Sequence, residues 1–179
     1  MGSGEQFGLD LGVPVERTEW GKWVDPERHR AQARKFMDRA AIAGIPSAPW
    51  PEDSAEVRQL NSIVGEIFPD MATAMAPENA EVTDAFVCFL GECFAKFAGA
   101  RWVEWEWPGP EFTFYEHVNP ALLCDTEDED EITAWALVDD MINHHRGEYA
   151  GMFSYIAAVL REYAADHAEK RREETASTS

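Results

Sequence analysis

The stretch of the chain that most constrains the fold runs from Thr83 to Ala98, because it is apolar on nearly every side. The spacing predicts a single helix, with Gly99 just past its end. Its apolar side chains are Ala85, Phe86, Val87, Cys88, Phe89, Leu90, Cys93, Phe94 and Phe97. A helix that is apolar all round lies inside a core, so other elements of the chain must surround this one.

The segments on either side of this helix predict further helices. Residues 25–27, Asp-Pro-Glu, supply a capping carboxylate, a proline for the first turn and an acid, and the helix that they begin stops at Gly44. Apolar residues then recur at helical spacing in several other places. Four further helices are expected. The first begins at about Ser54 and ends at Pro69, and the second, a short one, begins at Asn119 and runs through Leu123. The third begins in the latter part of residues 125–131 and runs to about 145, and the fourth spans about 148–167.

The apolar period changes from 3.6 to 2 after the central helix. Residues 102–107 alternate, and residues 108–110, Pro-Gly-Pro, are typical of a turn. Residues 111–116 then predict a returning strand. A lone hairpin is marginally stable, so it must pack on the helices. The sequence therefore predicts a mostly helical α+β fold, with four to five helices packed around one β-hairpin.

The domain organisation follows from these elements. Residues 1–24 show no clean period and predict an irregular N-terminal arm, which Trp20 and Trp23 would attach to the body. Residues 25–168 predict a single α+β domain. Residues 169–179 are polar and predict a flexible C-terminal tail.

The negative charge of the chain is concentrated in its middle. The net charge is −19, and residues 51–145 hold 21 acids against three bases, a net charge of −18. Such a field repels nucleic acid and attracts basic partners. An acidic surface that serves only solubility would give the same counts. The one concentrated positive patch lies on the first predicted helix, at Arg28, Arg30, Arg34, Lys35 and Arg39.

The stretch from about Val82 to Leu123 resembles small bacterial helix–hairpin–helix domains of unknown function. The residues that carry the resemblance are Leu90-Gly91-Glu92 in the apolar helix, the step Gly99-Ala100-Arg101-Trp102 into a strand, and Asn119-Pro120 at the start of another helix. These motifs are structural, so the resemblance implies no catalytic residue.

Motifs for catalysis, metal binding and phosphate binding are missing from the sequence. There is no G-x-S-x-G elbow and no glycine-rich phosphate loop. The acidic run 125–131 lacks the central glycine and distal glutamate of an EF-hand loop. The three cysteines fit small buried side chains in a reducing compartment better than a disulfide framework. We therefore expect no catalytic residue, no metal site and no cofactor, and a binding protein rather than an enzyme.

The predicted hairpin would place aromatic and acidic side chains together on an exposed face. Exposed aromatic side chains rimmed by acids are typical of an interface for a cationic partner. Cover of this face by the first helix or the arm is an equal alternative. The predicted partner-binding residues are Trp102, Glu104, Glu106, Tyr115, Glu116, Glu127, Asp128, Glu129 and Asp130.

The sequence thus predicts an acidic protein-interaction module that binds and masks a basic protein, as an immunity protein, antitoxin or inhibitor does. The alternatives are a DNA mimic, a small hydrolase that uses Glu92 or His117, and a structural protein that assembles through its basic helix, for example as a homodimer. We expect no direct binding of nucleic acid, no membrane association and a cytoplasmic location, because the sequence shows neither a membrane span nor a secretory signal.

Overall fold

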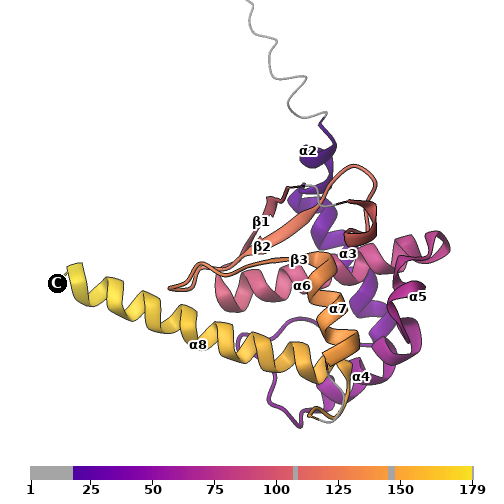
Figure 1. Cartoon of the computed structure of the whole chain (residues 1–179). Helices are drawn as coiled ribbons and strands as arrows, with labels where there is room; N and C mark the ends of the chain where they lie inside the picture. Colours follow the sequence, from indigo (N-terminus) through magenta and orange to yellow (C-terminus); the bar gives the residue numbers. More distant parts are fainter. Residues whose placement is uncertain (1–17, 107–108, 145–147, 179) are drawn as a thin grey trace, which may run out of the picture.

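A computed structural model describes residues 18–106, 109–144 and 148–178. Within these ranges the chain forms seven α-helices, two 3-10 helices and one three-stranded antiparallel sheet (Figure 1). The prediction of a mostly helical α+β fold is confirmed. In chain order the elements are α2 (Glu19–Trp23), α3 (Pro26–Ala40), α4 (Ala55–Ile67), α5 (Met71–Met75), η2 (Pro77–Asn79), α6 (Ala80–Ala98), β1 (Arg101–Glu104), η3 (Pro110–Phe112), β2 (Pro120–Leu123), β3 (Glu131–Thr133), α7 (Ala134–His144) and α8 (Met152–Thr178).

Helix α6 is the centre of the fold, as its apolar sequence predicts. Helices α3 and α8 pack along it, and strand β1 follows directly after it. Aromatic rings join the layers, since Phe89 of α6 contacts Phe36 of α3, Trp50 and Phe153 of α8. Phe36, Phe89 and Phe153 are fully buried, so the core is built around one set of large aromatic side chains whose rings are tilted against one another.

The predicted ends of α3 and α4 are largely confirmed. The carboxylate of Asp25 accepts a hydrogen bond from the backbone of Arg28, and Ser54 caps α4 through the backbone of Val57. Helix α3 ends at Ala40, four residues before Gly44. Its capping residue is Ala41, which adopts the left-handed conformation at φ 59° and donates its backbone N–H to the last turn.

The predicted hairpin between residues 102–107 and 111–116 is wrong. Strand β1 pairs instead with β2, which the sequence had assigned to a short helix, and β2 pairs with β3 in the order β1-β2-β3. An Asn-Pro pair can begin either element, and here Pro120 occupies the first position of a strand, where its missing N–H costs little. The side chain of Asn119 donates to the carbonyl of Glu106 and so ties the ends of β1 and β2 together.

Residues 111–116 fold back on themselves rather than forming a strand. The Thr113 hydroxyl donates to the carbonyl of Val118 and accepts from the backbone N–H of Tyr115, which holds a turn in place of a ladder. Alternating aromatic residues predict a strand only when it pairs with a neighbouring strand, and β1 pairs with β2 rather than with residues 111–116.

The acidic run connects β2 to β3 and does not begin a helix. The Thr126 hydroxyl donates to the Asp130 carboxylate, the backbone of Cys124 donates to the carbonyl of Asp130, and Glu129 has φ 51°. Helix α7 begins only after β3, where the Thr133 hydroxyl accepts from the backbone of Ala136. We call the connection, residues 124–130, the acidic turn.

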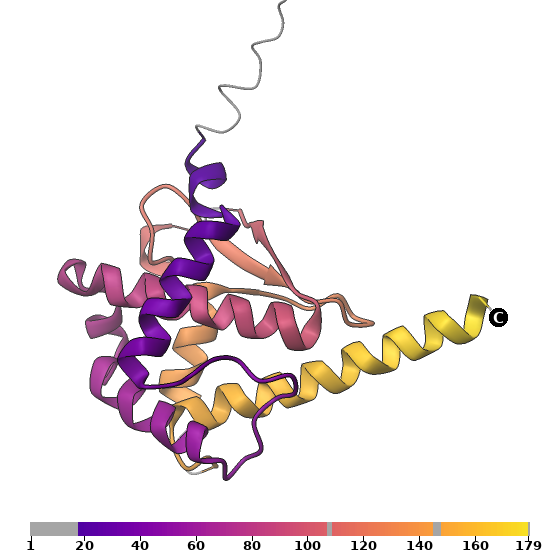
Figure 2. The same cartoon turned by 180° about the vertical axis from the view of Figure 1, so that it is seen from behind.

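Helix α8 continues to Thr178, through residues that the sequence had assigned to a flexible tail. Its last turns extend past the rest of the body (Figures 1 and 2). The acidic turn holds it from the side, since Asp125 accepts from Lys170 at 2.8 Å and its carbonyl oxygen contacts Nδ1 of His167 at 2.8 Å. The Lys170 ammonium lowers the pKa of Asp125 by donating to its carboxylate.

The predicted arm lies mostly outside the described residues, which begin at residue 18. Its last part is helix α2 rather than irregular chain, and Thr18 caps this helix. Trp23 is buried and Trp20 stacks on it at 5.6 Å, which confirms that these tryptophans attach the segment to the body. Across the described ranges, every helix is too short or too polar to span a bilayer.

Candidate interaction surface

A buried carboxylate joins three segments at one end of the molecule. Asp84 of α6 is 8% exposed and accepts three hydrogen bonds of 2.6 Å each. The donors are Arg28 and Gln32 of α3 and the hydroxyl of Tyr115. A buried carboxylate is tolerated when it is paired and hydrogen-bonded, so this set fixes α3 and residues 113–118 against α6.

Two of the predicted partner-binding residues belong to this buried region. Tyr115 donates to Asp84, and burial together with the Asp84 charge raises the pKa of Tyr115 well above its ordinary value. Trp102 packs edge-on against Trp23 at 5.0 Å and lies against Gly91 of α6. Neither side chain projects from an exposed hairpin, so the alternative in which α3 and α2 cover this face accounts for both.

His29 lies inside the same region and is 2% exposed. Its Nε2 is 2.8 Å from the carbonyl oxygen of Trp23, which requires a proton on Nε2. The other ring nitrogen is buried and has no hydrogen-bond partner among the described residues. Burial lowers the pKa of His29, and the Trp23 carbonyl offsets only part of that shift. The imidazole is therefore neutral in the folded protein near pH 7.

This neutral imidazole makes the stability of the protein fall in acid. The unfolded chain takes up a proton near pH 6.5, whereas the folded chain resists it, so the contribution of His29 is complete above pH 6.5 and decreases below it. At pH 5.5 the expected loss is at most about 1.4 kcal/mol. Urea unfolding at pH 7.5 and pH 5.5 measures it. His29→Gln keeps a donor for Trp23 and should show a smaller loss; an equal loss in both proteins would contradict the assignment.

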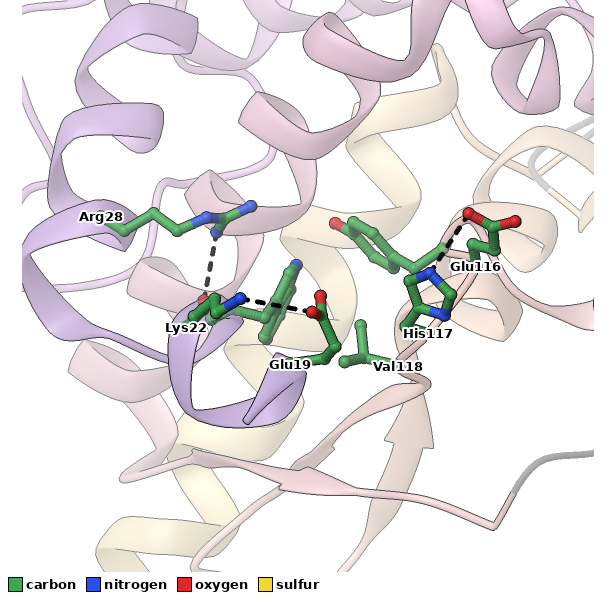
Figure 3. Close-up of a pocket in the computed structure, with 8 residues that line it drawn as sticks. Glu19, Lys22, Arg28, Glu116, His117 and Val118 are labelled. Atoms are coloured by element: carbon green, nitrogen blue, oxygen red, sulfur yellow. Dashed lines mark hydrogen bonds and ion pairs between the residues drawn. The ribbon is translucent and has the colours of Figure 1, made fainter. Parts of the chain in front are cut away.

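A pocket of about 330 Å³ opens beside this region, between α2 and residues 115–118 (Figure 3). Its rim carries one exposed ion pair, Lys22 with Glu19 at 3.4 Å, and a contact of 3.3 Å between His117 and Glu116. Arg28 forms one wall, over the ring of Trp23, and bonds Asp84. The polar side chains of the rim thus already contact one another, which gives the pocket little to select a ligand by.

The two residues named for a small hydrolase lie apart. His117 lines the pocket in Figure 3, but Glu92 of α6 does not. Burial raises the pKa of Glu92, while Lys96 donates to the carbonyl of Ile45. Burial raises the pKa of Cys88 and of Cys124 to about 12, which leaves both thiols protonated and unreactive. Across the described ranges, no three His, Cys, Asp or Glu side chains are grouped to hold a metal ion.

Two aromatic side chains remain on the surface beside the first turn of α7. Trp105 is 42% exposed and Phe112 is 44% exposed, and they are the only large apolar side chains that are exposed among the described residues. Phe112 meets Trp135 edge-on at 5.2 Å, and Trp135 donates its indole N–H to the sulfur of Met75. Trp105 lines a hollow with Ala136, the next residue of α7.

Exposed carboxylates lie near these rings. Glu104 and Glu106 flank Trp105 in the chain, Glu111 precedes Phe112, and Glu131 lines the hollow with Trp105. The alternation of β1 directs Glu104 and Glu106 to the face opposite Trp105, whereas Glu131 lies on the same side of the sheet as Trp105. Among the described residues, none of these four carboxylates forms an ion pair, so each keeps its attraction for a cation. We call this set, Trp105, Phe112, Trp135, Glu104, Glu106, Glu111 and Glu131, the aromatic–acidic surface.

The predicted site residues thus separate into three places. Trp102 and Tyr115 are half-buried against Trp23 and Asp84, and Glu116 lies on the rim of the pocket in Figure 3. Glu104 and Glu106 belong to the aromatic–acidic surface. Residues 127–130 lie in the acidic turn, at the opposite end of β2, because Glu104 pairs with Pro120 while the turn follows Leu123. In that turn Glu127, Asp128 and Glu129 are exposed, and Asp130 is bonded to Thr126.

The sequence prediction placed Trp102 on the exposed face of β1, whereas the exposed tryptophan is Trp105. Alternation places Val103 and Trp105 on one face of β1 and Trp102 on the other, and this pattern is present in the sequence. Alternation does not say which face is covered, and the residue that decides it is Gly91, whose missing side chain admits the ring of Trp102. Phe112 and Trp135 carry no periodic signal that would bring them together.

Comparisons of the chain with protein-family models, with curated proteins and with solved structures found no match. The resemblance of residues 82–123 to helix–hairpin–helix domains stays a prediction.

Proposed function

We propose that this protein is an acidic interaction module that binds and masks a basic protein partner, in the manner of an immunity protein, antitoxin or inhibitor. The observation that carries the proposal is the pair of exposed rings, Trp105 and Phe112, near exposed carboxylates that form no ion pair with any described residue. Aromatic side chains supply much of the binding energy at interfaces, and complementary charge supplies orientation and speed of association.

The charge of the chain supports the same partner class. Residues 51–145 carry a net charge of −18, and both the aromatic–acidic surface and the acidic turn come from this segment. A positively charged protein is drawn to such a field over the range set by salt, about 8–10 Å at physiological ionic strength. Capture from lysate of the native host, with washes in rising salt and identification by mass spectrometry, should therefore recover a basic protein whose retention falls steeply with salt.

The double variant Glu104→Lys/Glu106→Lys should weaken the affinity for the captured protein at least tenfold, because it reverses the two exposed charges that flank Trp105 in the chain. Isothermal titration calorimetry with the purified partner measures the change. The matched control is Glu127→Lys/Asp128→Lys, which makes the same change in net charge at the opposite end of β2. Equal weakening by both variants would mean that binding depends no more on this surface than on the acidic turn.

Duplex DNA added to the same titration separates this proposal from a DNA mimic. A masking protein that recognises a separate basic surface remains bound when DNA is present. Displacement of the protein by DNA from one shared site on the partner would instead favour the DNA-mimic alternative.

A further inference from the structure

The hollow beside Trp105 combines aromatic, apolar and acidic side chains. It measures about 220 Å³ and is lined by Trp105 from the end of β1, by Glu131, Ile132 and Thr133 of β3, and by Ala136 of α7. Pockets that hold drug-sized molecules usually measure about 300–1,000 Å³. This hollow is smaller, so its size suits one side chain of a partner rather than a separate ligand.

Its walls combine a flat aromatic ring with a single carboxylate. The indole of Trp105 is 42% exposed, Ile132 and Ala136 add apolar contact, and Glu131 is exposed. Thr133 is engaged, since its hydroxyl accepts from the backbone of Ala136. The hollow therefore offers a π face, an apolar wall and one negative charge, and none of its lining residues is basic.

The geometry of the sheet explains why the ring reaches this position. Val103 of β1, Ala121 of β2 and Thr133 of β3 lie opposite one another in register and share one face of the sheet. Trp105 follows two residues after Val103 and has the same direction. Because the middle residue of this row is a fully buried alanine, the ring has room to extend across β2 and line the hollow with β3.

We propose that this hollow receives one arginine side chain of the basic partner. This inference rests on the proposed function and names the group that the aromatic–acidic surface recognises. A guanidinium is planar and weakly hydrated, so it stacks on an indole while its N–H groups bond a carboxylate. A lysine ammonium is compact and strongly hydrated, so it gains less from the ring and the apolar wall.

The test is a titration of the protein with short peptides, and it does not require the partner protein. The probes are two capped tripeptides, Gly-Arg-Gly and Gly-Lys-Gly, and the readout is the NMR signal of the Trp105 indole N–H in protein labelled at tryptophan nitrogen. Trp105→Phe assigns that signal. We expect the arginine peptide to shift it with an affinity at least threefold tighter than the lysine peptide.

Glu131→Gln should weaken binding of the arginine peptide at least fivefold, whereas Glu127→Gln, an exposed carboxylate of the acidic turn, should leave it unchanged. Both changes are at exposed positions, and thermal unfolding confirms that the variants fold. Equal shifts by both peptides, or equal effects of the two glutamines, would overturn the inference. If no basic protein is captured from lysate but the arginine peptide still binds more tightly than the lysine peptide, the proposed function alone is overturned. If a basic protein is captured but the two peptides bind equally, the arginine pocket alone is overturned.

Discussion

Gly91→Ala is expected to lower the free energy of unfolding by about 2 kcal/mol. A Cβ at this position would lie 2.5 Å from Nε1 and 2.6 Å from Cζ2 of Trp102. The ring cannot move away freely, because Trp23 packs against it at 5.0 Å. Overpacking costs about 1–3 kcal/mol, and the upper end applies at so short a distance, so the ~1 kcal/mol gained from replacing glycine in a helix leaves a net loss of about 2 kcal/mol. Urea unfolding followed by circular dichroism measures the difference.

Gly65→Ala is the matched control for this change. Gly65 also lies inside a helix, but nothing would come within 4 Å of an added Cβ. The same substitution should therefore raise the free energy of unfolding by up to about 1 kcal/mol. The two variants should differ in sign, and a stabilising Gly91→Ala would show that Trp102 does not occupy the space above α6.

Asp84→Ala is expected to cost about 3 kcal/mol of stability. The change removes the acceptor of Arg28, Gln32 and Tyr115 at once, and it leaves a partly buried guanidinium without its carboxylate. Breaking a buried ion pair costs about 3–5 kcal/mol, and the lower end applies because the Arg28 side chain keeps 30% of its exposure to water. Chemical unfolding at neutral pH measures the loss.

Asp38→Ala provides the comparison for Asp84→Ala. Asp38 pairs with Arg34 at 3.0 Å on the outer face of α3, and its side chain is 70% exposed. Exposed pairs contribute at most about 1 kcal/mol, so this variant should change stability little. If the two aspartate variants lose equal stability, the hydrogen bonds of Asp84 contribute no more than a surface pair does.

Helices α3, α4 and α6 could be predicted from the sequence because their signals are local, whereas the helix predicted at residues 119–123 is strand β2. The cap at Asp25, the cap at Ser54 and the apolar run of α6 each lie within a few residues, and each marks the element that the structure shows. The partner of β1 could not be predicted in this way. Pairing is decided between distant segments, and the local alternation of residues 111–116 gave a stronger strand signal than β2 does.

The kinds of residue in the candidate site could be predicted from the sequence, but which of them are exposed could not. Glutamates and tryptophans between residues 102 and 116 indicated an aromatic and acidic face, and Glu104 and Glu106 are exposed there. The choice between Trp102 and Trp105 depended on which side α6 covers, and Tyr115 was drawn inside by Asp84, a residue 31 positions earlier. The spacing of residues 102–116 predicts neither of these contacts.

Exposed acids lie near both ends of β2, and their separation limits which basic proteins can contact both groups. Glu104 lies at the Pro120 end of that strand, and the acidic turn begins beyond Leu123, so the two groups are separated by at least about 10 Å along the sheet. A partner that engages both must carry two basic areas at a matching separation. The fixed length of the sheet then favours partners whose basic groups are spaced to match, rather than partners of high total charge.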